Sequence, residues 1–143
     1  MTQFGPPEMR ALLAEIFAPW IQDLSITPVD QSPTGARFTL PQNAALVRTG
    51  GEGPAVVCGQ AIASAADTAS VLALSGLNGR FRNCTTVDMT THFMRPLKLG
   101  DIDITIEALS NGRRMAVTKA EFRAKGSDRL AATATCTFAY LED

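Results

Sequence analysis

The sequence predicts an α+β domain with one antiparallel sheet and a long central helix. Three observations lead to this prediction. Gly59 to Leu77 is a proline-free, alanine-rich segment with apolar residues at helical spacing. Four segments after Asn83 alternate apolar and polar side chains, which is typical of half-buried strands. Turn sequences such as Asn111-Gly112 lie between those segments and favour tight antiparallel connections.

The N-terminal part begins with a short helix and continues with a hairpin. Pro6 and Pro7 precede residues 8–18, whose apolar positions recur at helical spacing until Pro19 ends the pattern. Residues 25–40 change to a period of two around a turn sequence at residues 31–35, which indicates two paired strands. A loop over residues 41–53 follows.

The long helix and four later strands supply most of the expected core. Small side chains on one stripe of residues 59–77 let strands approach the helix backbone closely, so we expect the sheet to wrap around it. The later strands are expected at residues 84–94, 102–107, 115–124 and 130–141. The expected core consists of the even-numbered residues from Ile102 to Ala108 with Phe38, Val87, Met89, Phe93, Phe122 and Phe138.

Length, charge and cysteine content limit the classes of protein. The 143 residues, 45% of them apolar, suffice for one domain with a real core, so we expect a single domain over residues 1–143. Thirteen basic residues against 14 acidic ones argue against a nucleic-acid partner. One histidine and three scattered cysteines do not form a recognisable metal-ligand set or a disulfide framework. No segment is apolar enough for a membrane span, and we expect a cytoplasmic protein.

Asp67 is the residue that stands out chemically. It is the only charged residue between Glu52 and Arg80, and it lies mid-helix among small apolar neighbours. Burying a carboxylate is unfavourable unless something pairs with it or uses it, and such groups often have functional roles. Asp67 is therefore a candidate functional residue, although a solvated or ion-paired carboxylate would give the same pattern. Signatures of serine hydrolases, nucleoside-triphosphatases and dinucleotide oxidoreductases are absent from the sequence.

Three further segments are informative when they are taken together and in order, namely Cys58 to Ala69, Thr86 to Asp101 and Asn111 to Val117. Together they resemble the PaaI-type thioesterases of the hotdog superfamily. The resemblance covers roughly residues 49–140 and implies a hotdog fold that hydrolyses an acyl-CoA thioester without a cofactor or metal. It also implies a homodimer or homotetramer, because in this family the site forms between two protomers.

The resemblance implies roles for four residues. Asp67 matches the helical carboxylate that acts as general base or nucleophile at the thioester carbonyl. Gly59 and Gln60 match the helix start, where a backbone N–H polarises the thioester oxygen. Such an N–H has no partner within the helix and lies at the positive end of the helix dipole. Thr86 of the partner subunit matches the residue that positions water.

Two positions depart from the family pattern. Cys58 stands where histidine is common, and Glu52 falls where many members have asparagine or glutamine. A Glu52 near Asp67 would raise the pKa of one of the two carboxyls, whereas a differently built loop would point Glu52 into water.

Several basic residues are candidates for substrate binding. Arginine forks match phosphate oxygens in pairs, and coenzyme A carries a diphosphate and a ribose phosphate. His92 is a further candidate, because a period of two places it on one strand face with Thr86 and Asp88. The arginine candidates are Arg82, Arg95, Arg113 and Arg114.

Two alternative functions stay open from the sequence. An acyl-CoA hydratase on the same fold would pair a histidine with a carboxylate, and His92 is the only histidine. A non-catalytic acyl-CoA-binding or assembly module would result if Cys58, Gln60 and Glu52 have replaced catalytic groups.

Overall fold

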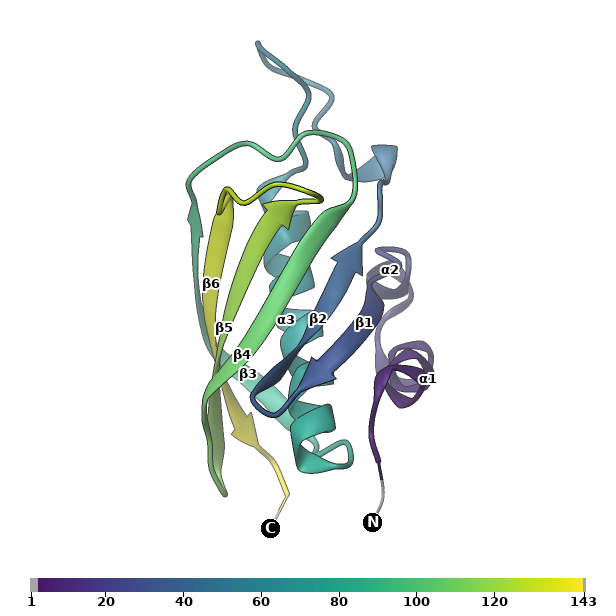
Figure 1. The fold of residues 1–143 in the computed structure, drawn as a ribbon, viewed down its shortest axis with the longest axis vertical. Helices are drawn as coiled ribbons and strands as arrows, with labels where there is room; N and C mark the ends of the chain where they lie inside the picture. Colours follow the sequence, from purple (N-terminus) through teal and green to yellow (C-terminus); the bar gives the residue numbers. More distant parts are fainter. Residues whose placement is uncertain (1–2, 143) are drawn as a thin grey trace.

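A six-stranded antiparallel sheet curves around helix α3 in the computed structural model, which describes residues 3–142 (Figure 1). The strands are ordered β1-β2-β4-β5-β6-β3 across the sheet. They are β1 (Thr27–Ser32), β2 (Gly35–Leu40), β3 (Cys84–Phe93), β4 (Ile102–Asn111), β5 (Met115–Ala124) and β6 (Ala132–Tyr140). The helices are α1 (Pro6–Ile16), α2 (Pro19–Gln22), the 3-10 turn η1 (Ala44–Leu46) and α3 (Gly59–Asn78). This arrangement confirms the predicted fold class.

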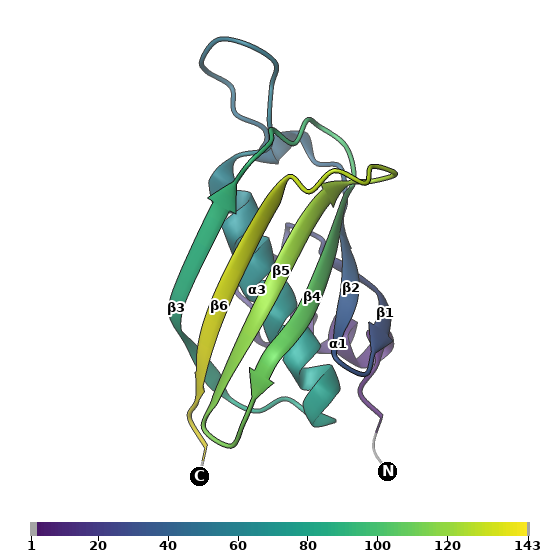
Figure 2. The same cartoon turned by 60° about the vertical axis from the view of Figure 1, so that its left-hand side comes forward.

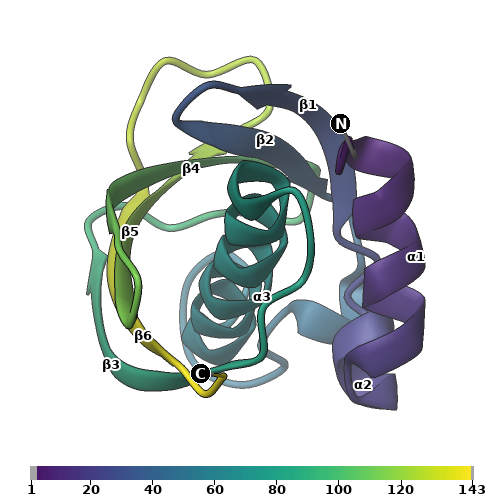
Figure 3. The ribbon, with the colours of Figure 1, turned by 90° about the horizontal axis from the view of Figure 1, so that it is seen from below.

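Helix α3 runs along the concave side of the sheet, as the view from below shows (Figure 3). It begins at the predicted residue, Gly59, and ends one residue beyond the predicted end. Gly79 terminates it with a φ of 72°, a left-handed conformation that glycine adopts without steric cost. No helix within residues 3–142 is long and apolar enough to cross a membrane.

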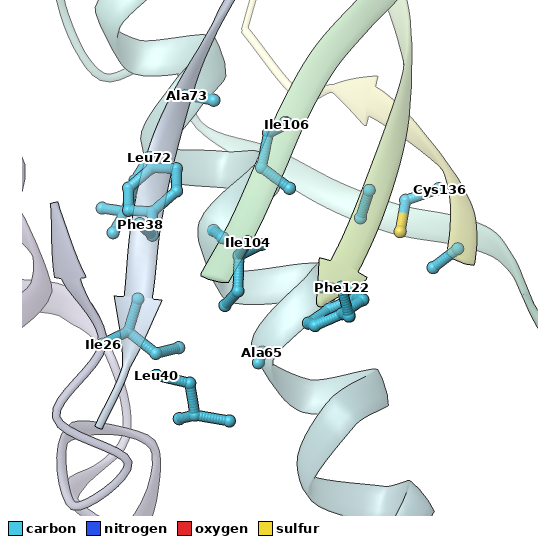
Figure 4. Close-up of a cluster of buried hydrophobic side chains, with 14 of the residues drawn as sticks. Ile26, Phe38, Leu40, Ala65, Leu72, Ala73, Ile104, Ile106, Phe122 and Cys136 are labelled. Atoms are coloured by element: carbon cyan, nitrogen blue, oxygen red, sulfur yellow. The ribbon is translucent and has the colours of Figure 1, made fainter. Parts of the chain in front are cut away.

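The core lies between α3 and the inner face of the sheet. Ala65 and Leu72 of α3 are fully buried, and small α3 side chains let the strands approach the helix closely (Figure 4). Ile102, Ile104 and Ile106 face the helix as predicted. The predicted core residues Phe38, Phe122 and Phe138 are also buried.

The N-terminal helices pack at the β1 side of the sheet. Met9, Leu12 and Leu13 form the buried face of α1, in agreement with the predicted amphipathic pattern. The pattern stops at Phe17, and Pro19 begins the short helix α2, because proline suits the first position of a helix.

Strand β3 is the outermost strand on the other side of the sheet (Figure 2). The expectation that Val87, Met89 and Phe93 belong to the core is wrong for the single chain. Their exposed fractions are 51%, 37% and 55%. The alternating pattern identified a strand correctly, but it did not show that, within residues 3–142, this strand pairs with β6 alone. Because β3 is an edge strand, its apolar side chains have no neighbouring strand on one side and stay exposed in the single chain.

A β-bulge at Val87 divides β3 into two halves. Because of the extra residue, the alternation of side chains between the inner and outer faces of the sheet is reversed after the bulge. The register with β6 shifts between Thr86 and Asp88, which leaves Val87 without a partner. Thr86 is paired with the buried Phe138 and therefore lies on the inner face, whereas His92 is paired with Thr133 on the outer face. The expectation that His92 shares a face with Thr86 is wrong, because one extra residue reverses the alternation.

Candidate active site

Asp67 and Thr86 meet where α3 passes the inner face of β3. Asp67 is half-buried in the middle of α3, and the Thr86 hydroxyl donates a hydrogen bond of 2.7 Å to its Oδ1 atom. The bulge at Val87 is what allows Thr86 to face inward while the later half of β3 keeps its pairing with β6. The family resemblance implied that Thr86 comes from the partner subunit, but this hydrogen bond forms within one chain.

The carboxylate of Asp67 affects the two thiols nearest to it. Burial raises the pKa of Cys84 above its ordinary value of 9.0, and the charge of Asp67 raises it further. The pKa of Cys136 is raised by the same two causes in the same order. Both thiols therefore stay protonated at neutral pH, and thiolate is the nucleophilic form of cysteine. Of these groups, only the Asp67 carboxylate is suited to act as a base or nucleophile.

The N-terminus of α3 offers unpaired backbone donors. The Cys58 side chain makes no capping hydrogen bond. Cys58 is the N-cap residue, so Gly59 and Gln60 are the first two helical residues. Their N–H groups have no intrahelical acceptor, and they lie at the positive end of the helix dipole. Gly59 also lies close to Phe93. A Cβ atom added at Gly59 would be 3.2 Å from the Phe93 ring. A larger residue would press on that ring.

A cavity of about 390 Å³ opens beside this helix start. Its wall is mostly apolar, and the guanidinium-bearing residues Arg48 and Arg95 also line it. The other lining residues are Val56, Val57, Gly59, Ile62, Phe93, Met94, Pro96 and Leu97. Such a lining suits an apolar chain that lies beside backbone N–H donors. No local sequence pattern marks this cavity, because its residues come from three segments that only the fold brings together.

One chain does not place all of these groups around one carbonyl carbon. Asp67 follows Gln60 by seven residues and Gly59 by eight, which at 1.5 Å per residue separates them by roughly 10–12 Å along the helix axis. Oxyanion donors act at about 3 Å, and a base or nucleophile must be equally close to the reacting atoms. The set of groups is therefore incomplete within one chain.

The loop over residues 48–56 projects from the same end of the domain (Figure 1). Its base is closed by pairing of Val47 with Val57 and by a 3.0 Å hydrogen bond from the Arg48 N–H to the Val56 carbonyl. Glu52 is exposed within this loop. Of the two arrangements left open by the sequence, the structure shows the one in which the loop points Glu52 into water.

The four candidate arginines lie at two opposite ends of α3. Arg95 lines the cavity at the helix start, whereas Arg82, Arg113 and Arg114 line a larger hollow of about 750 Å³ near the helix end. Arg82 is held in place by bonds to the Glu142 carboxylate and to the carbonyl oxygens of residues 112 and 113. Its guanidinium also stacks 3.6 Å from the centre of the Tyr140 ring. Arg82 therefore has a structural role.

The sequence did not indicate the polar network that supports this second hollow. The Asn78 amide donates to the Tyr140 hydroxyl at 2.9 Å, and that hydroxyl donates to Asn111 at 2.6 Å. The Asn111 amide donates in turn to Asn78 at 2.9 Å, which closes a ring between α3, β4 and β6. These three residues are far apart in the sequence, so no local pattern marks them.

The family follows from a comparison of the sequence with known families. Residues 55–131, more than half of the chain, match the family described as the thioesterase superfamily. The chain belongs to the thioesterase superfamily. The matched region contains Gly59, Gln60, Asp67 and Thr86, the residues that the structure arranges around α3 and β3. Membership of this superfamily supports hydrolysis of a thioester in general terms.

Individual relatives agree with this family and fold. The Caenorhabditis elegans protein F42H10.6, whose name suggests an esterase, is 33% identical over 67 residues. That match covers 46% of this chain and 40% of the relative, so the chain matches less than half the length of this curated relative.

Solved structures extend the similarity over nearly the whole chain. The conserved protein PA5202 from Pseudomonas aeruginosa is 29% identical, with a TM-score of 0.75 over 90% of this chain and 98% of that one. The thioesterase HI1161 from Haemophilus influenzae is 17% identical, with a TM-score of 0.82 over 99% of this chain and 96% of that one. The second likeness concerns the fold alone and confirms the hotdog architecture.

Proposed function

We propose that this protein hydrolyses an acyl-CoA thioester to a free acid and coenzyme A, with Asp67 as general base or nucleophile. The observation that carries the proposal is the hydrogen bond between Thr86 and Asp67 inside the region that matches the thioesterase superfamily. The Thr86 hydroxyl holds the Asp67 carboxylate in one orientation, and Asp67 is only half-buried among small residues of α3. A carboxylate in this position can contact both a water molecule and a carbonyl group. The esterase and thioesterase names of relatives support the same reaction class.

In the general-base route, Asp67 takes a proton from a water molecule as the water oxygen attacks the thioester carbon. Thr86 donates its hydrogen to Asp67, so its oxygen retains lone pairs that accept a hydrogen bond from that water. The carbonyl oxygen becomes an oxyanion, which the N–H of Gln60 or Gly59 stabilises. The C–S bond then breaks, and the coenzyme A thiolate leaves and takes up a proton.

In the nucleophilic route, a carboxylate oxygen of Asp67 attacks the thioester carbon directly and coenzyme A leaves as its thiolate. The resulting mixed anhydride is then cleaved by water, which regenerates the carboxylate and releases the acid. Thr86 would orient Asp67 in the first step and water in the second. The oxyanion donors serve both steps in the same way.

The active form in this proposal is a homodimer, or a homotetramer made of such dimers, with β3 at the interface. Edge strands leave backbone groups unpaired along one side, and β3 adds the exposed apolar residues Val87 and Met89. Antiparallel pairing of two β3 strands brings the end of one strand beside the start of the other. The helix start and Phe93 of one chain then approach Thr86 and Asp67 of its partner, which completes the set of groups.

The test is a thiol-release assay with short, medium, long and aromatic acyl-CoA thioesters, using wild type and Asp67→Asn. Asparagine keeps the size of the side chain but removes its charge and basicity, so a rate that falls by about a hundredfold or more is expected. Thermal denaturation of both proteins checks that the variant is folded. Equal turnover by both proteins would reject the role of Asp67, and no turnover on any thioester would favour the non-catalytic binding module.

The hydratase alternative loses its structural basis. It requires a histidine close to a carboxylate at the site, and His92 is paired with Thr133 on the outer face of the sheet. Asp67 and Thr86 lie on the inner face. The outer-face position also removes His92 from the side chains that would contact substrate in this proposal.

A further inference from the structure

Small side chains form much of the contact between α3 and the strands β5 and β6. The buried alanines on the facing surfaces are Ala65, Ala66, Ala69 and Ala73 of α3, Ala116 and Ala120 of β5, and Ala132 and Ala134 of β6. Alanine has no side-chain atom beyond Cβ, so this stretch lets the helix approach closely but offers few interlocking side chains against rotation of α3. A polar contact within such a stretch therefore has a large share in fixing how the helix is rotated.

A buried side-chain hydrogen bond crosses this contact. The Thr118 hydroxyl of β5 donates to the Ser70 hydroxyl of α3 at 2.8 Å. The two residues are 1% and 0% exposed. A buried hydroxyl without a partner is costly, and a hydrogen bond tolerates only a narrow range of distances and angles. The bond between Ser70 and Thr118 therefore favours one rotation and one axial position of α3 relative to β5.

This buried pair lies next to the proposed base. Ser70 follows Asp67 by three residues, so the two side chains are neighbours on the helix surface. Thr118 is paired with Cys136 of β6, and Thr86 is paired with the residue two positions further along the same strand. Burial and then the charge of Asp67 raise the pKa of the Cys136 thiol. Hydrogen bonding with Ser70 and Thr118 opposes this rise, so one thiol is close to both groups.

We propose that Ser70 and Thr118 are positioning residues, which fix the rotation of α3 so that its carboxylate faces the hydroxyl of β3. The inference rests on the proposed role of Asp67 in thioester hydrolysis and adds two buried residues that act through it. The ends of helix side chains lie roughly 5–6 Å from the helix axis, so a rotation by about 10° moves the Asp67 carboxylate by about 1 Å. A misplacement of about this size can lower a rate about a hundredfold.

Steady-state hydrolysis by Thr118→Val and Ser70→Ala tests the proposal. Valine has nearly the shape of threonine but lacks the hydroxyl. Each variant is expected to lower kcat about tenfold or more with little change in KM, because the pair acts on the orientation of Asp67 and not on substrate binding. Thr118→Ser keeps the hydroxyl and is expected to retain most of the wild-type kcat.

Ser75 provides a matched control on the same helix. Its hydroxyl is also buried, but it donates to the Val71 carbonyl of α3 at 2.9 Å and so does not connect the helix to the sheet. Ser75→Ala is expected to keep the wild-type kcat. A fall in kcat as large as that of Ser70→Ala would show that loss of any buried α3 hydroxyl has this effect, and would overturn the proposal.

The double variant S70A/T118V separates positioning from stability. Each single change leaves a buried hydroxyl without its hydroxyl partner, which lowers Tm, whereas the double variant leaves neither hydroxyl. The double variant is expected to have a Tm closer to that of wild type than either single variant, yet a kcat as low as theirs. Recovery of kcat together with Tm would overturn the positioning role, because activity would then follow stability alone.

Crystal structures of Thr118→Val and Ser75→Ala give a readout that needs no catalysis. The hydrogen bond between Thr86 and Asp67, 2.7 Å in wild type, is expected to lengthen beyond hydrogen-bonding distance in Thr118→Val and to remain in Ser75→Ala. An unchanged bond or a wild-type kcat in Thr118→Val would overturn the positioning role even if the protein is a thioesterase. A bond lost in Thr118→Val alone would support that role even if no thioester is hydrolysed.

Discussion

The Thr86 hydroxyl donates a 2.7 Å hydrogen bond to Oδ1 of Asp67, and so joins the edge strand of the sheet to the middle of the central helix. This bond fixes the orientation of the carboxylate and places a second oxygen beside it. We predict that Thr86→Val lowers kcat by about tenfold or more, because the lost bond is to a charged group. Thr86→Ser keeps the hydroxyl and is expected to retain most of the activity. Steady-state kinetics of the three proteins measures the effect.

A purely structural role for Thr86 would give a different result. Valine and threonine have nearly the same shape, and residue 86 is exposed, so thermal stability is expected to change little in either variant. If Thr86→Val loses activity only in proportion to lost folded protein, the positioning role is rejected. If Thr86→Ser is as inactive as Thr86→Val, the hydroxyl is not the group that matters.

The sequence predicted the elements around this pair but not its geometry. A period of two identified β3 correctly, since alternation depends only on local side-chain pattern. The bulge at Val87 depends on pairing with residues of β6 about 50 positions away in the sequence, and it moved His92 to the outer face. Asp67 was found because an isolated charge in an alanine-rich helix is visible without any tertiary information.

The oxyanion donor in our proposal is a backbone group, so substitution by proline is the direct test. Gln60 is the second residue of α3, where proline is tolerated because that N–H has no intrahelical partner. We predict that Gln60→Pro lowers kcat by about a hundredfold, the typical effect of losing one oxyanion donor. Gln60→Ala retains the N–H and is expected to keep kcat, because the Gln60 side chain is exposed.

Circular dichroism and thermal denaturation of both Gln60 variants show whether α3 has kept its first turn. Full activity in a folded Gln60→Pro protein would exclude this N–H as the donor. The N–H of Gly59 would then be the remaining candidate donor, but proline is not a clean test at that position, because a Cβ atom there would lie 3.2 Å from the Phe93 ring.

The two edge strands provide a matched pair of variants for the proposed interface. Val87 in β3 and Val29 in β1 each occupy a position where the strand register shifts, with exposed fractions of 51% and 50%. We predict that Val87→Lys dissociates the protein to a mass near the 15.2 kDa of one chain and abolishes thioester hydrolysis, because the charge would be buried at the interface. Val29→Lys is expected to leave both unchanged. Light scattering measures the mass, and a monomeric wild type would contradict the proposed interface.

The grouping of the arginines could not be predicted from the sequence either. Arg95 and Arg113 both follow the central helix and lie near turns, so no local sequence pattern separates them. The sheet order places them at opposite ends of the domain, because β3 runs away from the end where the β4–β5 hairpin turns.

Glu142 anchors the C-terminal segment, and this anchor is expected to depend on pH. Hydrogen bonds from Arg80 and Arg82 lower the pKa of Glu142 from 4.5 to about 2. A carboxyl whose pKa is lower in the folded than in the unfolded protein stabilises the fold above the unfolded pKa, and this contribution is lost as the pH falls through the folded pKa.

We predict that Glu142→Gln has a lower Tm than wild type at pH 7, and that the difference narrows from about pH 4.5 and disappears near pH 2. Thermal denaturation across this range measures it, with Glu15→Gln as a control, since the exposed Glu15 forms no ion pair within residues 3–142. A difference that stays constant down to pH 2 would show that the Glu142 carboxylate does not stabilise the fold through its charge.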